Sequence, residues 1–547
     1  MLALTRPLRL LAVCALTIAA SFLLLRSAPP AHAESDYTSI MMDDNNLVYG
    51  STATSNATLT QMKALGVQYV RVTVLWANLA DGMQAYDRKH HIAFNQANPA
   101  AYPPLNWNRY DNIVQTASRL GLGVYFDVTG PGPSYTHAKP PKSLRADVAD
   151  TYEPNVKMFY EFVAAVGKRY SGSYRKGRIT LPRVSTWSLW NEPNQGGWLT
   201  PQWKKVGGQL IPWSPVMYRE LYINGWLALQ NTGHAKDHIF IGETSPLGVT
   251  RRTQTSEIDP TTFIRETFCV TSSYVPYTGS AASARDCGIF DQYPTLYATA
   301  WAHHPYTKTT PPTEVESNPN DITMANLDQV HTLLYAIGNA THRVNPNLPI
   351  ISTEFGYQTN PPSPYFGVSL ADQEQWNNEG DFLAYFDPDV IGQTQFLLKD
   401  VPPDRAFPKG SRGYWSTYQS GLEYTNGTPK PSYTAYQLPF VVAPSTPNPT
   451  TGQPQMFVWG QLRFMDNLSL PPTFEFAQVQ FEPTGSSTWT SVGSLIPILN
   501  TFNHGFFGTV PVPGAGQVRL FWSGGGRMGN KVSRAIAVTA AGVSAIN

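Results

Sequence analysis

Eight short apolar runs, each separated from the next by a longer segment, constrain the fold of this chain more than any other sequence feature. They lie between residues 44 and 398 and are rich in β-branched and aromatic residues. Several are apolar on both faces, which is typical of buried parallel strands. The runs are DNNLVYG (44–50), VQYVRVTVLW (67–76), GVYFDVTG (123–130), VSTWSLWNE (184–192), HIFIGETS (238–245), YATAWAHHPY (297–306), PIISTEFGY (349–357) and VIGQTQFLL (390–398).

The segments between the runs have helical patterns. Residues 106–121 space their apolar side chains three and four apart and end at Gly121, a common helix stop. Segments that begin at residues 153, 214, 323 and 369 follow the same pattern. Strands that alternate with helices in this way predict an α/β fold, a (β/α)8 TIM barrel spanning residues 34–440. An open doubly wound sheet is the alternative, and it is disfavoured because no Gly-rich phosphate turn follows the first run.

The composition changes after residue 440. Residues 441–455, VVAPSTPNPTTGQPQ, have no hydrophobic period and indicate a Pro/Thr/Ser-rich linker. Residues 456–547 contain alternating segments bounded by Gly, Pro and Asn, with no helical pattern between them. They predict a small all-β sandwich domain.

The first 33 residues predict a secretion signal peptide. Arg6 and Arg9 precede the apolar segment LLAVCALTIAASFLLL, and residues 31–33 (Ala-His-Ala) fit a small-x-small cleavage site. A membrane anchor is the alternative, but the apolar segment is short for a membrane span and ends at Arg26. We therefore expect a secreted, extracellular protein that has no membrane contact after cleavage.

Two cysteines, Cys269 and Cys287, remain after the signal is removed. In an oxidising compartment, this pair on either side of a Gly/Ser/Pro-containing segment predicts one disulfide that closes a surface loop. Two unpaired buried thiols are the alternative. A metal site is not expected here, because no His or further Cys lies at ligand spacing.

The charge balance excludes one class of partner. The net charge is +1 and the sequence contains no basic run, whereas phosphate binding requires clustered Lys and Arg. Hydrophobic residues make up 42% of the chain and charged residues 14%, which is ample for a large core. We therefore expect no nucleic-acid partner.

Reactive side chains gather where the predicted strands end. In a barrel, the carboxyl ends of the strands and the loops that follow them form the catalytic face. Buried ionised carboxylates need partners, so acids at several strand ends would be an unusual way to build a core. The side chains are Arg71 and Asp127 on the second and third runs, Asn191 and Glu192 on the fourth, Glu243 on the fifth, His304 and Tyr306 on the sixth, and Glu354 on the seventh.

Two carboxylates that face one cavity suit the cleavage of a glycosidic bond. One acid must be protonated, so that it can give a proton to the departing sugar oxygen. The other must be ionised, either to attack the anomeric carbon or to activate water. Arg71 is the candidate for holding the second carboxylate in its ionised form.

The motif WNEPN at the end of the fourth run, together with TEFGY at the end of the seventh, resembles glycoside hydrolase clan A. That clan consists of retaining (β/α)8 enzymes and includes families 5 and 39. The resemblance covers roughly residues 40–440 and implies that Glu192 is the acid/base and Glu354 the nucleophile. It also implies supporting roles: Asn191 at the sugar 2-hydroxyl, Arg71 beside the nucleophile, and His304 and Tyr306 at the nucleophile and substrate.

The eighth run departs from the clan's pattern. Many members carry a Trp near the end of this strand as a sugar platform, and GQTQFLLKD contains none. Gln395, Phe396 or Trp415 are candidates to take over part of that role. Trp198, just past the fourth run, is a candidate to stack on a sugar, with core packing as the alternative.

Three further residues have roles that the sequence leaves open or assigns to structure. Glu243 either lines a substrate subsite or pairs with Arg71 or another cation. Asp127 and His303 are interpreted as structural residues.

These patterns together predict a secreted retaining glycoside hydrolase that acts on oligo- or polysaccharides by double displacement, without a metal or an organic cofactor. The alternative is a catalytically inactive barrel that binds glycans. A barrel enzyme of another class is less well supported, because metal-ligand spacing and a phosphate loop are both missing. The sandwich domain either braces the barrel or binds carbohydrate, and bracing is favoured. The sugar, the linkage, endo or exo action and the oligomeric state stay open.

Overall fold

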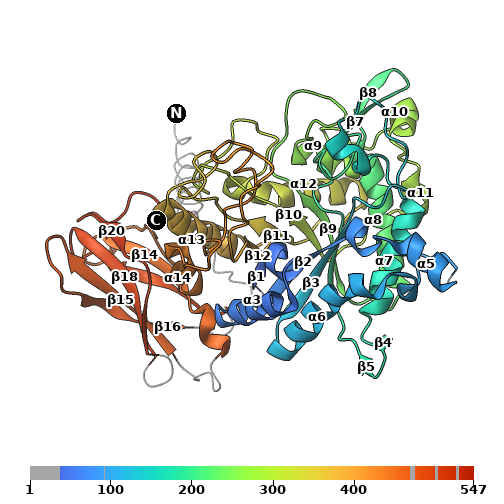
Figure 1. Ribbon diagram of the computed structural model, residues 1–547. Helices are drawn as coiled ribbons and strands as arrows, with labels where there is room; N and C mark the ends of the chain where they lie inside the picture. The colour runs from blue at the N-terminus through green and yellow to red at the C-terminus, as the bar shows by residue number, and fades with distance from the viewer. Residues whose placement is uncertain (1–36, 92, 468–474, 499–502, 525–528) are drawn as a thin grey trace, which may run out of the picture.

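The computed structural model describes residues 37–91, 93–467, 475–498, 503–524 and 529–547 (Figure 1). Parallel strands form a closed barrel in the order β1-β12-β11-β10-β9-β6-β3-β2. This confirms the predicted (β/α)8 barrel and excludes an open doubly wound sheet. The strands are β1 (Thr38–Met42), β2 (Tyr69–Leu75), β3 (Gly123–Thr129), β6 (Thr186–Leu189), β9 (His238–Thr244), β10 (Ala300–His303), β11 (Ile350–Phe355) and β12 (Val390–Phe396).

The first strand does not lie where the sequence pattern placed it. The run at 44–50 was predicted to be a strand, but β1 precedes it and residues Asp44–Leu47 form the short helix α2. The Asp43 side chain accepts a hydrogen bond from the backbone N of Asn46 and so caps this helix. Asp is a preferred residue at that position, and its capping bond converts the apolar run into a helical turn. The other seven predicted strands are confirmed, with shorter limits.

The five predicted helical segments are confirmed as α6, α7, α8, α12 and α13. Gly121 ends α6 in the left-handed conformation, with a φ of 68° that glycine adopts without strain. The helices are α3 (Thr52–Ala64), α4 (Trp76–Leu79), α5 (Met83–His90), α6 (Pro104–Leu120), α7 (Val156–Arg169), α8 (Ser214–Gln230), α9 (Pro260–Thr267), α10 (Gly279–Ala284), α11 (Ile289–Gln292), α12 (Asp328–Thr341), α13 (Leu370–Phe386) and α14 (Pro431–Gln437). Two small hairpins pair β4 (Arg175–Lys176) with β5 (Ile179–Thr180) and β7 (Trp203–Val206) with β8 (Gln209–Pro212).

The inward side chains of the barrel change in character along the strands. A cluster of buried apolar side chains includes Ile40, Tyr125, Phe240, Ala302 and Ile351. Further along these strands, toward their carboxyl ends, the inward side chains become charged. The layered core below therefore supports a polar site at the carboxyl face.

The C-terminal region consists of two antiparallel sheets around a hydrophobic cluster of its own. This agrees with the predicted small β-sandwich. The expected linker is shorter than 441–455, because residues 441–444 belong to β13 and Gln455 begins β14. The strands are β13 (Phe440–Pro444), β14 (Gln455–Gln461), β15 (Glu475–Pro483), β16 (Thr490–Ile498), β17 (Gly505–Pro511), β18 (Gly516–Ser523), β19 (Asn530–Val532) and β20 (Ile536–Val538).

The sandwich packs against α13 of the barrel (Figure 1). Trp459 of β14 is fully buried, and its ring lies 5.8 Å from that of Phe382 and 5.1 Å from that of Tyr385. Next to these rings, Arg463 Nη2 lies 2.9 Å from the Asp381 carboxylate, and both side chains are buried. Aromatic packing and a buried ion pair therefore join the sandwich to α13.

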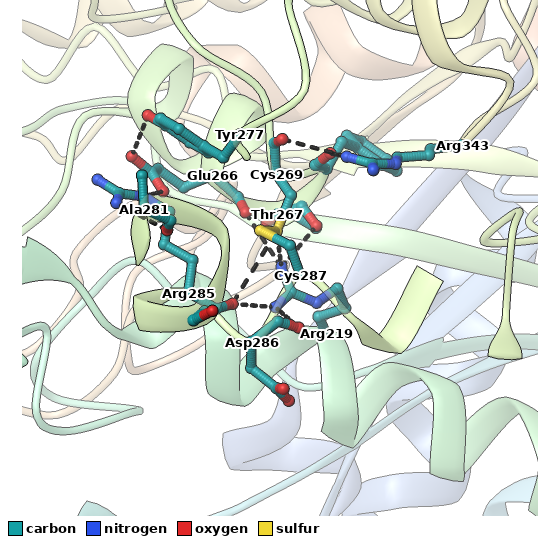
Figure 2. The surroundings of a disulfide bond; sticks show 12 residues. Arg219, Glu266, Thr267, Cys269, Tyr277, Ala281, Arg285, Asp286, Cys287 and Arg343 are labelled. Atoms are coloured by element: carbon teal, nitrogen blue, oxygen red, sulfur yellow. Dashed lines mark hydrogen bonds and ion pairs between the residues drawn. A yellow bond between two sulfur atoms is a disulfide. The ribbon is translucent and has the colours of Figure 1, made fainter. Parts of the chain in front are cut away.

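Cys269 and Cys287 form the predicted disulfide, with 5.8 Å between their Cα atoms. Both cysteines are buried, while the loop between them is largely exposed. Figure 2 shows two arginines that hold the chain around the bond. Arg219 donates to carbonyls on both sides of the disulfide, those of Glu266, Thr267, Arg285 and Asp286. Arg343 donates to the carbonyls of Phe268 and Cys269, so the loop is held by cations as well as by the covalent bond.

Within the described residues, no helix is both long enough and apolar enough to cross a membrane. The predicted signal peptide, residues 1–33, lies outside these residues.

Candidate active site

The carboxyl ends of five strands bring most of the candidate residues together. The connected residues are Arg71 from β2, Asn191 and Glu192 after β6, Glu243 from β9, His304 and Tyr306 after β10, and Glu354 from β11. Trp198 is the exception. Its described hydrogen bonds involve only its main chain and join it to Trp190 and Gln195.

Arg71 is fully buried and stands at the centre of the site. Its Nη1 donates to Glu354 Oε1 at 2.8 Å, and its Nη2 donates to Asn191 Oδ1 at 2.8 Å. The same Nη2 lies 3.0 Å from Glu243 Oε2 and 3.1 Å from Asp127 Oδ2. Burial alone would lower the pKa of Arg71, but the three carboxylates raise it well above its usual range. The guanidinium is therefore a permanent charge that fixes the position of Glu354.

Glu243 belongs to a bulge in β9. Ala302 and His303 of β10 pair with Gly242 and Thr244, so Glu243 is the extra residue between them. Its backbone has a φ of 48°, in the left-handed region that non-glycine residues rarely occupy. The fully buried carboxylate receives hydrogen bonds from Arg71, His304, Tyr125 and Thr353. Burial opposes its ionisation, but Arg71 and His304 hold the pKa of Glu243 well below its usual range.

These contacts decide between the two roles left open for Glu243. It pairs with Arg71 and His304, and its side chain has no solvent exposure with which to line a subsite.

Two neighbouring histidines have opposite environments. His304 Nε2 lies 2.7 Å from Glu243 Oε2, and His304 Nδ1 lies 2.9 Å from Glu192 Oε1. Burial acts to lower the pKa of His304, but Glu354, Glu192 and Glu243 together raise it to about 10. His303 instead bonds Thr244 Oγ1 and the Ile322 carbonyl, and burial lowers its pKa to about 3. His304 is therefore charged at neutral pH, and His303 is a neutral packing residue, as the sequence interpretation has it.

Glu192 and Glu354 are the acids of the site that reach solvent. Their side chains are 20% and 11% exposed, whereas those of Glu243 and Asp127 are fully buried. One carboxylate oxygen of Glu192 and one of Glu354 lie within 4.8 Å of each other, and each lies within the same distance of a ring nitrogen of His304. Two acids at this separation can act on opposite sides of one small group.

The turn that carries Glu192 is strained. Trp190 and Glu192 have φ values of 77° and 37°, and such left-handed residues cost roughly 1–3 kcal/mol each. Two hydrogen bonds hold the turn: Glu192 N donates to the Glu243 carbonyl at 2.9 Å, and Asn191 N donates to Thr129 Oγ1 at 2.9 Å. The sequence shows a strand that ends on an acid, but not that neighbouring strands fix the turn.

Tyr306 donates from its hydroxyl to Glu354 Oε2 at 3.0 Å. Its ring meets that of Phe396 edge-on at 5.9 Å, and Phe396 meets Tyr418 edge-on at 5.2 Å. Gln395 is buried and bonds Asn377 and backbone carbonyls, so it does not serve as a platform. Of the candidates at the eighth strand, Phe396 is therefore the one that packs between two aromatic rings, those of Tyr306 and Tyr418.

Sequence reasoning missed several residues of this network. Tyr418 is 54% exposed, and burial of its hydroxyl together with the charges of Glu192 and Glu354 raises its pKa to about 12. Tyr125 and Thr353 donate to Glu243, and Ser188 donates to Asp127 Oδ1 at 3.1 Å. Alternation could have found Tyr125, which lies two residues before Asp127 on β3.

Asp127 faces Arg71 from β3 and is fully buried. Burial raises the pKa of its carboxyl to about 7, against the pull of Arg71 and with the help of the neighbouring Glu243 carboxylate. Three carboxylates around one guanidinium make a proton on one of them favourable. Asp127 is therefore a structural partner of Arg71, in line with its interpretation from the sequence.

Among the described residues, one group of possible metal ligands lies close enough together to hold an ion. It consists of Glu192, His304 and Glu354. The ring nitrogens of His304 already have carboxylate partners, Glu192 and Glu243. Glu354 already receives hydrogen bonds from Arg71 and Tyr306. A metal would have to displace these contacts, so the donor set fits a hydrogen-bonded network better than a metal centre.

Comparison with known proteins identifies one matching family. A family model described as Cellulase (glycosyl hydrolase family 5) matches residues 33–399, which include the whole closed barrel. A search of curated proteins gives no match.

The matches among solved structures include several glycosidases. A family 39 glycoside hydrolase from the gut symbiont Bacteroides cellulosilyticus WH2 has a TM-score of 0.45 and 11% identity, covering 88% of this chain and 83% of its own. A glucosidase from Croceicoccus marinus has a TM-score of 0.42 and 11% identity over 80% of this chain and 76% of its own. GH5_18 from Streptomyces cattleya in complex with GlcNAc has a TM-score of 0.43 and 15% identity over 74% of this chain and 79% of its own.

Proposed function

Because the chain belongs to glycosyl hydrolase family 5, we propose that it is a secreted retaining glycoside hydrolase that cleaves O-glycosidic bonds in oligo- or polysaccharides. Glu354 attacks the anomeric carbon while Glu192 gives its proton to the departing oxygen. Glu192 then takes a proton from the water that releases the sugar from Glu354. The residues of this chain supply every group that these two steps use.

The observation that carries the proposal is the separation of the two solvent-reaching acids. A carboxylate oxygen of Glu192 lies within 4.8 Å of one of Glu354. Retaining enzymes place their carboxyl groups about 5–5.5 Å apart, whereas inverting enzymes leave about 6.5–9.5 Å for a water molecule. The short separation supports direct attack by one of the two carboxylates.

The environments of the two acids support the assignment of roles. Glu354 Oε1 receives Arg71 at 2.8 Å, and Glu354 Oε2 receives the Tyr306 hydroxyl at 3.0 Å. Donors on both oxygens hold the carboxylate in one position, which suits a nucleophile. Glu192 receives a single described side-chain contact, from His304, and is the more exposed of the two acids. An inactive glycan-binding barrel, the alternative, would have no use for a nucleophile prepared in this way.

Chemical rescue tests the proposal. Aryl glycosides of several sugars, including pentoses, would first identify an activated substrate for the wild-type enzyme. Glu354→Ala should lose turnover, and added azide should restore formation of a glycosyl azide of inverted configuration, read by NMR. Glu192→Ala should hydrolyse activated aryl glycosides slowly and give a glycosyl azide of retained configuration. Wild-type rates in both variants, or inverted product from the wild-type enzyme, would contradict the mechanism.

A further inference from the structure

Glu243 is a third acid of the site, and the proposed reaction gives it no task. Its Oε2 accepts from Arg71 at 3.0 Å, from Thr353 at 2.9 Å and from His304 at 2.7 Å. Its Oε1 accepts from the Tyr125 hydroxyl. Because both oxygens have donors and the side chain is fully buried, Glu243 does not touch a substrate. Any effect that it has on the reaction passes through one of its partners.

His304 is the partner that links Glu243 to the reacting acids. Its Nε2 faces Glu243, while its Nδ1 faces Glu192 Oε1 at 2.9 Å and Glu354 Oε2 at 3.7 Å. The ionised Glu243 can only accept a hydrogen bond, so Nε2 carries a proton. Nδ1 donates to Glu192 Oε1, which accepts as the carbonyl oxygen of the protonated acid and as a carboxylate oxygen after the proton has left. The ring is fully buried, and its other titratable neighbours are the neutral His303 and Tyr306, whose ring centroid lies 6.4 Å away. The Asp127 carboxyl also interacts with its charge, and Arg71 shares Glu243 Oε2 with it.

We propose that Glu243 is a positioning residue that keeps His304 as an imidazolium, and that this imidazolium is the counter-ion of Glu354 before the covalent intermediate forms and of Glu192 afterwards. The inference rests on the proposed retaining function and deepens it. His304 does not shuttle a proton in this scheme. It supplies a fixed positive charge beside both reacting acids.

The charge balance of the first step explains why such a charge is useful. When Glu354 attacks, a bond forms between its oxygen and the anomeric carbon, and the bond from that carbon to the leaving oxygen breaks. The proton of Glu192 moves to the leaving oxygen. One negative charge therefore disappears at Glu354 and one arises at Glu192, and His304 Nδ1 lies within 3.7 Å of both.

Arg71 does not contact both acids between which the negative charge moves. It is bound to Glu354, Asn191, Asp127 and Glu243, and none of its described contacts reaches Glu192. A buried imidazolium would normally lose its proton, since burial disfavours the charged form. The ionised Glu243 offsets this cost in both states, because its own charge does not change during the reaction.

The protonation state of His304 can be measured in the resting enzyme without turnover. Histidine-selective ¹⁵N labelling would be used for NMR, and the His304 signal would be assigned by its loss in His304→Gln. We expect the wild-type ring to be doubly protonated at pH 7 to 8 and the ring in Glu243→Gln to be neutral. A neutral ring in the wild type, or an unchanged imidazolium in Glu243→Gln, would overturn the proposal. A neutral ring in the wild type would overturn the proposal even if the variant does not fold.

Kinetics separate the positioning role from a loss of structure. Glu243→Gln should lower kcat/KM about 100-fold for aryl glycosides with poor leaving groups, since general acid catalysis contributes 10²- to 10⁴-fold. For dinitrophenyl glycosides, which leave without a proton, the loss should stay below about 10-fold. An equal loss for both substrates would contradict the proposal and indicate a damaged fold.

Glu266→Gln is the matched control. Glu266 is also a nearly buried acid, and its Oε2 lies 2.7 Å from Arg285 Nε, in the region of the disulfide and outside the site. It should keep both the imidazolium and the kinetics. Failure of the retaining function itself would have a different signature: no turnover of any glycoside by the wild type, with the NMR result unaffected.

Discussion

Arg71 on β2 and Glu354 on β11 form a 2.8 Å ion pair across the carboxyl end of the barrel. Two strands, β1 and β12, separate them in the barrel order. The pair therefore forms only when the barrel closes, which couples the position of the proposed nucleophile to the integrity of the fold.

Replacement of Arg71 should damage stability and activity together. Arg71→Met leaves three carboxylates without their cation, and removing one partner of a buried pair typically costs about 3–5 kcal/mol. Urea unfolding should show a loss in the free energy of unfolding of this size, and kcat/KM should fall at least about 100-fold.

The control for Arg71 is Arg145→Met. Arg145 pairs with Asp147 at 3.0 Å, and both side chains are 67% exposed, so its removal should change stability by less than about 1 kcal/mol. If Arg71→Met were as stable as this control, the central role of Arg71 would be wrong.

Tyr306→Phe should separate catalysis from stability. The change removes the hydroxyl that donates to Glu354 Oε2 at 3.0 Å and leaves the ring against Phe396. We expect kcat to fall roughly 10-fold, because the donor stabilises charge on the nucleophile, with a stability loss of about 1 kcal/mol. Steady-state kinetics and thermal unfolding would measure the two effects. Tyr222→Phe, which removes a 2.8 Å bond to the Tyr297 carbonyl, should lower stability alone.

The residues at strand ends were predictable because the rule that places them is simple. Parallel strands that alternate with helices close into a barrel whose carboxyl ends share one face, so Glu192 and Glu354 had to meet once both strands were recognised. The disulfide followed equally from its spacing. The first strand was missed because one capping bond, from Asn46 to Asp43, decides between helix and strand for the run that follows.

The partners of the site residues were less predictable. The role of Glu243 depends on a bulge that inserts one residue into β9, and a bulge leaves no mark in the alternation of one strand. Tyr418 lies in the long loop between β12 and α14, whose path no periodicity describes. Such residues are placed by contacts between segments far apart in the sequence, which pattern reading does not capture.

The two adjacent histidines should give stability opposite dependences on pH. The pKa of His304 is raised from 6.5 to about 10, so its contribution is fully present below pH 6.5 and is lost as the pH rises toward 10. The pKa of His303 is lowered to about 3, so its contribution is present above pH 6.5 and is lost as the pH falls toward 3.

Urea unfolding at pH 4, 6.5 and 9.5 would test this for His304→Gln and His303→Gln. Relative to the wild type, His304→Gln should lose more stability at pH 6.5 than at pH 9.5, by a few kcal/mol. His303→Gln should lose more at pH 6.5 than at pH 4. The same pH dependence in both variants would contradict the assigned charge states.

Tyr418→Ala should weaken substrate binding. The side chain is 54% exposed and its ring lies against that of Phe396. Burial of its hydroxyl and the charges of Glu192 and Glu354 raise its pKa, so it is placed to contact a sugar at the reacting centre. Aromatic contacts contribute about 0.5–1.5 kcal/mol, which predicts a roughly 10-fold higher KM. Tyr335→Ala is the control, because Tyr335 is 52% exposed on α12 and stacks on His331. An unchanged KM in Tyr418→Ala would remove it from the site.

The ion pair between Arg463 and Asp381 should decide whether the sandwich braces the barrel. Arg463→Met leaves the buried Asp381 carboxylate of α13 without its cation, and the expected loss is about 3–5 kcal/mol. Adding Asp381→Leu should recover most of that loss, since apolar side chains can replace a buried pair. Thermal unfolding of the full chain would measure both variants.

Arg519→Met is the matched control for Arg463→Met. Arg519 covers the ring of Trp489 at 4.0 Å within the sandwich, so its loss should affect that domain alone. If the sandwich is a brace, Arg463→Met lowers the temperature at which the barrel loses glycosidase activity, whereas Arg519→Met does not. Equal inactivation temperatures would contradict the bracing role and favour the alternative for the sandwich, carbohydrate binding.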